Sequence, residues 1–196
     1  PATLTVSAIA DNKVYDATTA ATASLTDNRF ANDVLTVNTT GADFSDKNVG
    51  NGKNVTVNGV TLSGTDAANY ILDTNPVTST ADITPATLTV SAIADNKVYD
   101  ATTAATASLT DNRFNGDLLN ISTNGADFSD KNVGSDKTVT VNGVSLSGTD
   151  AANYILDTTP VTSTADITPA TLTVSAIADN KVYDATTVAT ASLADN

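Results

Sequence analysis

The sequence contains no cysteine, histidine, methionine, tryptophan, glutamate or glutamine, and these absences exclude several kinds of chemistry. Without cysteine there is no disulfide, thiol nucleophile or zinc–thiolate site. Without histidine the chain lacks the usual general base and the most frequent transition-metal ligand. No glycine-rich phosphate loop or serine nucleophile elbow replaces them. We therefore expect a protein that is not an enzyme.

Positive charge is also scarce. Nine Lys and Arg face 22 acidic residues, all of them Asp, for a net charge of −13. Such a chain repels the phosphate backbone, so we expect no nucleic-acid partner. No apolar run approaches the 18 or so residues of a membrane-spanning helix, so we expect no membrane insertion. Thr favours strands, and Asn, Asp and Gly favour turns, so the composition predicts a mainly β protein.

The sequence repeats itself with a period of 84 residues. The opening segment Pro1-Ala2-Thr3-Leu4-Thr5-Val6 recurs at Pro85 and at Pro169, and the first two copies differ at 12 of 84 positions. We predict domains at 1–84 and 85–168, followed by the truncated start of a third repeat at 169–196. A frame of 29–112 and 113–196 is the alternative. Proline between strand-like runs favours the first frame because it interrupts a ladder. We expect the chain to belong to a longer tandem array, with any targeting segment outside it.

Within a repeat, apolar residues alternate with polar ones, which is typical of strands. We expect strands at 13–16, 22–25, 34–38, 42–45, 70–72 and 78–83, with alternation also around 4–6, 55–57 and 60–62. Asn58-Gly59 indicates a bulge or a tight hairpin turn. One short helical turn is expected at 65–69, capped by Thr65 or Asp66. We expect Tyr15 to be a core ring with its hydroxyl bonded to backbone, and Asp16 to cap the turn that follows.

Ten of the twelve differences between the copies fall between residues 31 and 54. Apolar character survives there, as Val34 becomes Leu118 and Val37 becomes Ile121, while the polar neighbours change freely. The pattern indicates a strand with a buried face and an open face, together with its loops. A variable ligand-contact face is the second interpretation.

Two further kinds of site are considered. Asp and Asn oxygens suit calcium, and Asp11, Asn12, Asp27 and Asp66 are the candidate ligands. Because the carboxylates are dispersed, we interpret them as solvated turn caps and expect no cofactor, with calcium left open. An amide cross-link from Lys13, Lys47 or Lys53 to Asn or Asp is a further alternative.

Several motifs carry a resemblance that covers essentially the whole chain. They are Lys13-Val14-Tyr15-Asp16-Ala17-Thr18-Thr19, Phe44-Ser45-Asp46-Lys47-Asn48-Val49-Gly50, the run 55–64, Ala68-Asn69-Tyr70 and Ala81-Asp82-Ile83-Thr84-Pro85. In order and spacing the chain resembles the YDG-type (MBG-like) tandem repeats of filamentous-haemagglutinin-like large bacterial adhesins. One departure is that alanine (Ala17, Ala101, Ala185) stands where the family has glycine after Tyr-Asp. We expect this position not to adopt a left-handed backbone.

The resemblance implies tandem small β-rich domains, β-grasp-like or β-sandwich, arranged as an elongated rod. It also implies a structural stalk or spacer of a bacterial surface or secreted adhesin, outside the cell, that projects a distal adhesive region. The expected partners are neighbouring repeats, with a host-cell or matrix ligand bound through the parent protein. Direct adhesion to a host or biofilm glycan or protein through the 31–54 face is the alternative. The expected structural residues are Tyr15, Asp16, Phe44, Asn69, Tyr70, Tyr99, Asp100, Phe128, Asn153 and Tyr154.

Overall fold

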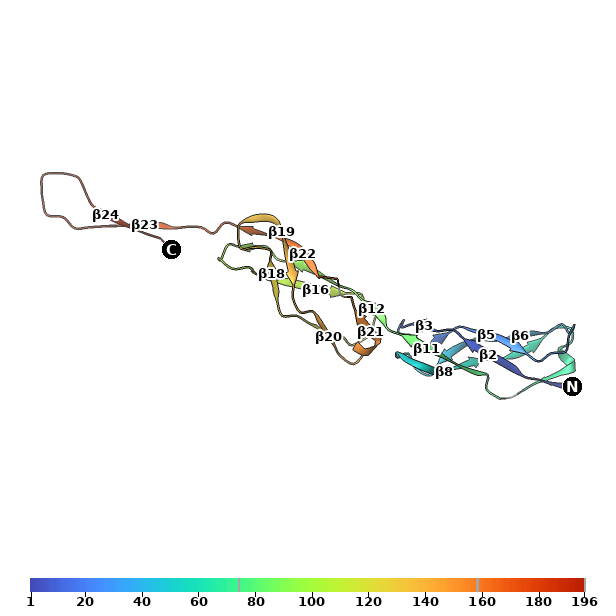
Figure 1. Cartoon of the computed structure of the whole chain (residues 1–196). Helices are drawn as coiled ribbons and strands as arrows, with labels where there is room; N and C mark the ends of the chain where they lie inside the picture. The colour runs from blue at the N-terminus through green and yellow to red at the C-terminus, as the bar shows by residue number, and fades with distance from the viewer. Residues whose placement is uncertain (74, 158, 196) are drawn as a thin grey trace. The chain divides into compact units, whose positions relative to one another are not determined.

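The computed structural model describes residues 1–73, 75–157 and 159–195 (Figure 1). Strands dominate these residues, and the helical segments described are two 3-10 turns, η1 (Ala67–Asn69) and η2 (Ala151–Asn153). The predicted mainly β class, with one short helical turn in each full repeat, is confirmed. Asp66 stands at the N-terminus of η1, but its side chain does not cap the helix and bonds elsewhere.

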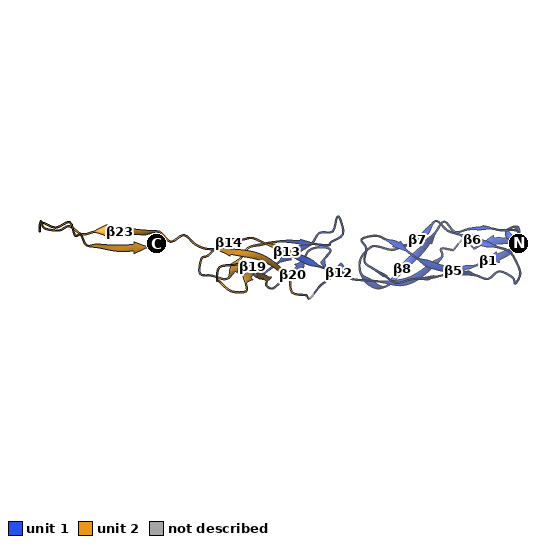
Figure 2. Cartoon of the chain, turned by 90° about the horizontal axis from the view of Figure 1, so that it is seen from above, with its two compact units in different colours: residues 1–91, 109–124, 143–159 blue, residues 92–108, 125–142, 160–196 orange. Residues whose placement is uncertain are grey.

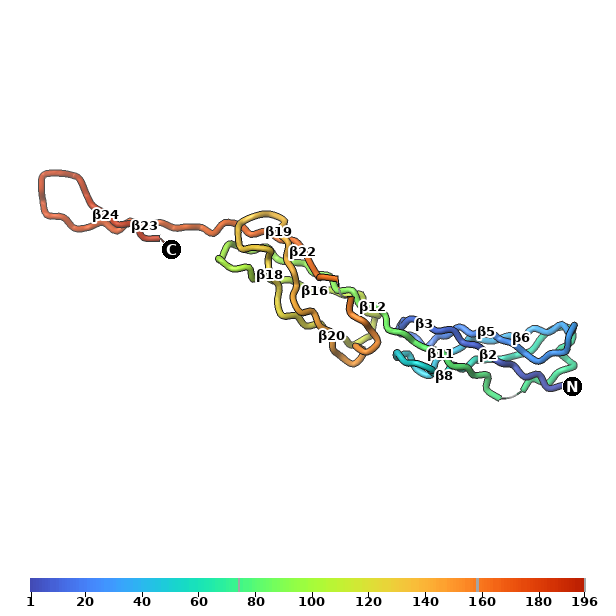
Figure 3. The backbone as a smooth tube through the Cα atoms, viewed as in Figure 1, coloured from blue at the N-terminus to red at the C-terminus, as the bar shows by residue number. Residues whose placement is uncertain are grey.

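The first repeat forms one larger sheet and three strand pairs. The five-stranded sheet has the order β3-β11-β8-β7-β4, and the pairs are β1-β10, β2-β5 and β6-β9. Two of the contacts are parallel, β1 with β10 and β3 with β11. The strands are β1 (Ala2–Leu4), β2 (Val6–Ala10), β3 (Lys13–Val14), β4 (Ala20–Ala21), β5 (Ala23–Asp27), β6 (Thr36–Asn38), β7 (Gly41–Phe44), β8 (Gly50–Asn58), β9 (Thr61–Ser63), β10 (Tyr70–Leu72) and β11 (Thr78–Thr84). The trace in Figure 3 shows β2 and β5 running side by side.

The second repeat has the same pattern of pairing. Its five-stranded sheet has the order β14-β22-β19-β18-β15, and its pairs are β12-β21, β13-β16 and β17-β20. The strands are β12 (Ala86–Leu88), β13 (Val90–Ala94), β14 (Lys97–Val98), β15 (Ala104–Ala105), β16 (Ala107–Asp111), β17 (Asn120–Ser122), β18 (Ala126–Phe128), β19 (Gly134–Val141), β20 (Ser145–Ser147), β21 (Tyr154–Leu156) and β22 (Thr162–Thr168). The two copies, which differ at 12 of 84 positions, thus fold with the same topology.

The third copy forms a strand pair with itself. Strands β23 (Val174–Ala178) and β24 (Ala191–Asp195) pair antiparallel, and every residue of both is exposed.

The chain divides into two compact units, coloured separately in Figure 2. Unit 1 contains residues 1–91, 109–124 and 143–159, and unit 2 contains 92–108, 125–142 and 160–196. Unit 1 therefore joins the first repeat to two segments of the second. Its main core continues from one repeat to the next, because the buried residues Phe44, Val55 and Ile83 belong to the same cluster as Leu88 and Tyr154.

The expectation at Asn58-Gly59 was wrong. β8 ends at Asn58 and β9 begins at Thr61, but the two strands do not pair. β8 pairs with β7 and β11, whereas β9 pairs with β6. Gly59, with a φ of 58°, lets the chain leave one sheet and enter another. The register irregularity lies instead in the β11–β8 pair, between Ala81 and Ile83. Asn58-Gly59 therefore marks a change of sheet rather than a bulge or a hairpin.

Candidate functional site: the junction between repeats

The loop after β3 places Tyr15 at one end of the first repeat. Lys13 ties the loop together: its Nζ lies 2.7 Å from the Asp16 carboxylate and donates to the carbonyl oxygens of Thr18 and Ala20 at 2.9 Å. Asp16 also accepts a hydrogen bond of 2.9 Å from the backbone N–H of Thr18. Because all these contacts join near neighbours in sequence, the motif specifies its own loop.

Ala17 adopts a left-handed backbone within this loop. Its φ is 63°, and the equivalent Ala101 and Ala185 have φ values of 66° and 55°. The expectation that alanine here avoids the left-handed region was wrong. The bonds made by Lys13 and Asp16 on either side of Ala17 hold the conformation despite the clash of its Cβ with the backbone.

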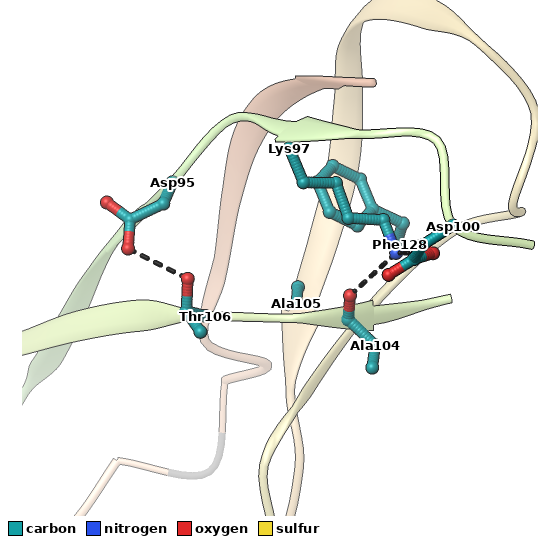
Figure 4. A pocket seen from close by; sticks show the side chains of 7 residues that line it. All are labelled: Asp95, Lys97, Asp100, Ala104, Ala105, Thr106 and Phe128. Atoms are coloured by element: carbon teal, nitrogen blue, oxygen red, sulfur yellow. Dashed lines mark hydrogen bonds and ion pairs between the residues drawn. The ribbon is translucent and has the colours of Figure 1, made fainter. Parts of the chain in front are cut away.

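The same loop recurs in unit 2 and is visible in Figure 4. Lys97 lies 2.8 Å from Asp100, donates to the Ala104 carbonyl oxygen at 3.0 Å, and holds its Nζ 5.5 Å from the centre of the Phe128 ring. These side chains line a hollow of about 320 Å³ together with Asp95, Ala105 and Thr106. The ammonium group of Lys97 thus attaches the loop to the sheet.

The residues of the second repeat that meet Tyr15 come from two loops. Gly148 allows the loops to approach, because a Cβ there would lie 2.4 Å from the carbonyl oxygen of Leu118. Asp150 then accepts a hydrogen bond of 2.8 Å from the backbone N–H of Leu118. Arg113 pairs with Asp111 and donates to the Leu119 carbonyl oxygen at 2.7 Å. These contacts fix the backbone on both sides of Asp117.

Asp117 is the centre of the junction, and its side chain is fully buried. Its carboxylate accepts hydrogen bonds from the hydroxyl of Tyr15 at 2.8 Å, the ammonium of Lys47 at 2.7 Å and the hydroxyl of Tyr154 at 2.7 Å. Lys47 lies 3.7 Å from a second carboxylate, that of Asp150. A buried charge is tolerated only when it is paired and hydrogen-bonded, as Asp117 is. Two of its three donors belong to the first repeat and the third to the second.

Asn153 forms a second polar contact beside Asp117. Its side-chain oxygen accepts a hydrogen bond of 2.9 Å from the backbone N–H of Val49, and its amide nitrogen donates to the side-chain oxygen of Asn48 at 3.1 Å. The contact uses both halves of the amide, so it fixes the orientation as well as the position of the two repeats at this point.

Aromatic rings surround the charged groups. The Tyr15 ring packs edge-on against Tyr154 at a centroid distance of 5.5 Å and against Phe114 at 5.8 Å. The Lys47 ammonium lies 5.8 Å from the centre of the Tyr15 ring. Rings exclude water from the carboxylate, which strengthens its hydrogen bonds.

We call the two halves of this contact the base surface and the tip surface. The base surface of the first repeat consists of Tyr15, Lys47, Asn48 and Val49, and in the second repeat of Tyr99, Lys131, Asn132 and Val133. The tip surface of the second repeat consists of Phe114, Asp117, Asp150, Asn153 and Tyr154, and in the first repeat of Phe30, Asp33, Asp66, Asn69 and Tyr70. Every one of these residues is identical in the two copies.

Because the copies are identical at these positions, differences in exposure measure the junction itself. Asp117 is 5% exposed and Asn153 is 3% exposed, while Asp33 is half-buried and Asn69 is exposed. Tyr15 is 1% exposed, whereas Tyr99 is half-buried. Contact between repeats therefore buries Tyr15, Asp117 and Asn153, whereas the fold of one repeat already buries Tyr154, since Tyr154 and its equivalent Tyr70 are both 7% exposed.

The pKa shifts agree with a fully charged ion pair. Burial by itself raises the pKa of Asp117, but hydrogen bonds from Lys47, Tyr154 and Tyr15 outweigh it and hold that pKa below its ordinary value. Hydrogen bonds with Asp117 and Tyr15 raise the pKa of Lys47 well above its usual range. Burial, followed by the hydrogen bond to Asp117, raises the pKa of Tyr154 to about 12. A charged lysine is not a nucleophile, so this pairing works against an amide bond between Lys47 and Asp117.

The four candidate calcium ligands each take part in a different hydrogen bond or ion pair. The side-chain oxygens of Asp11 and Asn12 accept from Thr22 and from the backbone of Asp82, those of Asp27 pair with Arg29, and that of Asp66 accepts from the backbone of Val34. Residues 1–73, 75–157 and 159–195 contain no group of three or more acidic side chains placed to hold a metal ion. Calcium binding stays a prediction, to be checked by melting with calcium and with a chelator.

Some of the expected structural residues stabilise a single repeat, and others lie at the junction between repeats. Phe44 and Phe128 are buried in the sheets at 3% exposure, and Asp16 and Asp100 hold their loops. Tyr15, Asn153 and Tyr154 meet at the junction, whereas their equivalents Tyr99, Asn69 and Tyr70 lie outside it. The hydroxyl of Tyr15 bonds to a carboxylate, so the expected backbone acceptor was wrong.

Sequence reasoning missed Lys47 and Asp117 as partners. A signal was present for Asp117, because it and its equivalent Asp33 are unchanged although the residues on either side of them differ, whereas Lys47 lies in residues 41–50, which are identical to 125–134 and give no such signal. A charged residue that stays constant among changing neighbours indicates a specific contact.

Comparison with known proteins identifies the repeat. The YDG domain matches residues 1–79 and again 84–162, and these two ranges contain both sides of the junction. No curated protein and no solved structure matches the chain. Within the part of the chain that the structure describes, no helix is both long and apolar enough to cross a membrane. The chain therefore belongs to the YDG domain family and contains two tandem copies of that domain.

Proposed function

We propose that the chain is a structural spacer, a stalk repeat of a bacterial surface or secreted adhesin that projects a distal adhesive region. The observation that carries the proposal is the buried cluster around Asp117, whose carboxylate accepts hydrogen bonds from two tyrosine hydroxyls and one lysine ammonium. A flexible linker between independent domains has no need of such a cluster. A stalk does, because each repeat must transmit its direction to the next.

The repetition of the contact residues supports the same function. Both surfaces of the junction are identical in the two copies, so each further repeat can form the same contact with its neighbour. From the size of a compact 84-residue domain we expect about 30–40 Å of reach per repeat. The absence of cysteine suits a chain that folds outside the cell without an oxidant, and the negative charge keeps neighbouring stalks apart.

Small-angle scattering tests the spacer function with arrays of two, three and four repeats. We expect the maximum dimension to grow by a constant increment per repeat. The matched array carries Asp→Asn at the position of Asp117 in every internal junction, and we expect it to show a shorter and broader distance distribution. A maximum dimension that does not grow with repeat number, or equal distributions for the two arrays, would contradict the proposal.

Direct adhesion through the 31–54 face is the second candidate. One observation favours it: the exposed residues that differ between the copies are not the residues that form the junction. Thr36 and Asn38 are exposed on β6 and differ from the exposed Asn120 and Ser122 on β17, while the junction residues do not change. Binding of a two-repeat protein to a glycan panel or to host cells, abolished when residues 36–38 are replaced by Ser, would support this candidate over the spacer.

A further inference from the structure

Asparagine is followed by glycine at five places in the chain: 51–52, 58–59, 115–116, 124–125 and 142–143. This pair is chemically reactive, because glycine has no side chain to keep its backbone nitrogen away from the amide of the preceding asparagine. The two groups react only when they reach each other in the right geometry, and hydrogen bonds that hold either group elsewhere prevent this. The surroundings of each pair therefore decide which one reacts.

Three of the pairs are held by a carboxylate. The backbone N–H of Gly52, which is the attacking group at 51–52, donates to the carboxylate of Asp82 at 2.7 Å. The side-chain amide of Asn58 donates to the carboxylate of Asp43 at 2.6 Å. The amide of Asn142 makes the equivalent bond in the second repeat, at 2.8 Å. In each pair a hydrogen bond must break before the groups can react.

The pair at 124–125 is confined by the residues that follow strand β19. The backbone N–H of Asn142 donates to the carbonyl oxygen of Gly125 at 2.8 Å. Asn124 lies close to Gly143, since a Cβ added to that glycine would be 2.3 Å from the amide nitrogen of Asn124. Packing thus restricts both members of this pair.

Asn115-Gly116 has no such restraint. The two residues form the corner of a turn in which the backbone N–H of Asp117 donates to the carbonyl oxygen of Phe114 at 3.2 Å. Both are exposed, and Gly116 has a φ of 92°. Within residues 1–73, 75–157 and 159–195, neither the side-chain amide of Asn115 nor the N–H of Gly116 makes a hydrogen bond. Both reacting groups are therefore open to water and to each other.

We propose that Asn115-Gly116 is a site of spontaneous deamidation, and that the products loosen the junction between the repeats. The backbone nitrogen of Gly116 gives its proton to hydroxide from solvent and attacks Cγ of Asn115. The bond from Cγ to the side-chain nitrogen breaks, and ammonia leaves with a proton taken from water. Water then opens the resulting succinimide ring at one of its two carbonyl carbons, which gives aspartate or isoaspartate. One water is consumed and one ammonia released, and nothing is oxidised or reduced.

The position of the turn connects this reaction to the junction. A new carboxylate at position 115 lies two residues before Asp117, which together with Asp150 already faces the single ammonium of Lys47. Like charges near this group weaken the pairing. Isoaspartate also adds the side-chain carbon to the backbone path, which lengthens the turn that places Asp117. The reaction itself does not depend on the spacer function, and the loosening rests on the junction geometry that supports it.

The first repeat supplies a matched control within the same chain. Ala31-Asn32 stands there in place of Asn115-Gly116. The nitrogen that would attack Asn32 belongs to Asp33, and it donates to the carbonyl oxygen of Phe30 at 3.2 Å. We therefore expect this turn to stay unmodified under the conditions that convert Asn115.

Peptide mapping by mass spectrometry tests the reaction in the full 196-residue chain. The folded protein is kept at mildly alkaline pH and sampled over days, and trypsin then releases residues 114–131 and, as the control, 30–47. We expect Asn115 to convert at least about fivefold faster than the three pairs held by a carboxylate, because each of those must first break a hydrogen bond. In urea the five pairs should convert at similar rates. Equal rates in the folded chain, or another pair converting first, would overturn the assignment of this site.

Hydrogen exchange tests the effect on the junction. The backbone N–H of Val49, which donates to Asn153, should exchange faster in the deamidated protein than in fresh protein. Asn115→Ala cannot form the succinimide, so its exchange should not change with incubation. Asn115→Asp carries the charge of one product from the start and should show part of the increase without incubation.

Two outcomes separate a failure of the modification from a failure of the junction. Lys47→Ala removes a donor to Asp117 without any deamidation and should also quicken the exchange of Val49. Unchanged exchange in the deamidated protein alone would overturn the loosening and leave the junction intact. Unchanged exchange in both proteins would overturn the loosening together with the role of the junction.

Discussion

The hydroxyl of Tyr15 lies 2.8 Å from the carboxylate of Asp117, a residue 102 positions later in the chain. The bond joins the tyrosine of one repeat's characteristic motif to an aspartate of the next repeat that stays constant although the residues on either side of it differ between the copies. It explains why Tyr15 is 1% exposed while Tyr99, in the same motif, is half-buried. The motif residue therefore has a role between domains in addition to its role within one.

Replacing Lys47 by Ala should weaken the junction, and Lys131→Ala is the matched control. Lys47→Ala leaves the buried Asp117 carboxylate with one donor fewer, at a cost of about 1–3 kcal/mol in the free energy of unfolding. Lys131→Ala removes an exposed side chain in the same sequence context, at a cost within about 0.5 kcal/mol. Urea denaturation compares the two values. Hydrogen exchange of the Val49 amide, which donates to Asn153, should quicken in Lys47→Ala alone. Equal effects of the two substitutions would contradict the role of the junction.

Acid should weaken the junction because the pKa of Asp117 is lowered in the folded protein. A carboxyl group with a lowered folded pKa contributes its full stabilisation above the unfolded value of about 3.9. That contribution is lost as pH falls through the lower folded value. We expect the difference in melting temperature between wild type and Asp117→Asn to be largest near neutral pH and to shrink below about pH 4. Asp33→Asn is the control on the uncovered tip surface. A difference that stays constant down to about pH 2 would show that the charge of Asp117 is not linked to folding.

Alkali should act through Tyr154, whose pKa is raised to about 12. A group whose folded pKa is raised contributes full stability below its unfolded pKa, here about 10. Stability then falls as pH rises from about 10 towards the folded value. Because the chain has no Trp, absorbance of the tyrosinate band follows this titration directly. Burial and hydrogen bonds to carboxylates also raise the pKa of Tyr15 and of Tyr70, so we expect several late-titrating tyrosines in the wild type and one fewer in Tyr154→Phe. Titration of all tyrosines in a single step near pH 10 would refute the assignment.

Glycine at position 17 should make the folded protein more stable than alanine does. The φ of 63° is a left-handed conformation that costs an L-residue about 1–2 kcal/mol and glycine nothing. Part of this gain is offset by the greater freedom of glycine in the unfolded chain, so we expect Ala17→Gly to raise the free energy of unfolding by up to about 1 kcal/mol. Ala21→Gly, within strand β4, is the control and should lower it by about 0.5–1 kcal/mol. Thermal and urea melts give both values, and a destabilised Ala17→Gly would mean that the loop holds no strain.

The sequence by itself determined the features that depend on near neighbours. The alternation of apolar and polar residues and the composition were sufficient to predict the β class. The period of 84 residues was sufficient to predict two copies of the same fold. The loop that holds Tyr15 forms even in the third copy, where Lys181 donates to the carbonyl oxygens of Thr186 and Val188 although that copy has no core. Its bonds span at most seven residues, so no distant part of the chain is needed to form it.

Only the tertiary structure decided what this loop is for. Asp117 looks like any turn aspartate in the sequence, and its copy Asp33 remains half-buried. The difference arises when a neighbouring repeat covers the carboxylate and brings Tyr15 and Lys47 to it from 102 and 70 residues away. The change from β8 to β9 across Gly59 was hidden for the same reason, because pairing partners are chosen by packing over long distances. Local patterns specify conformation, but burial and pairing depend on which surfaces the whole chain brings together.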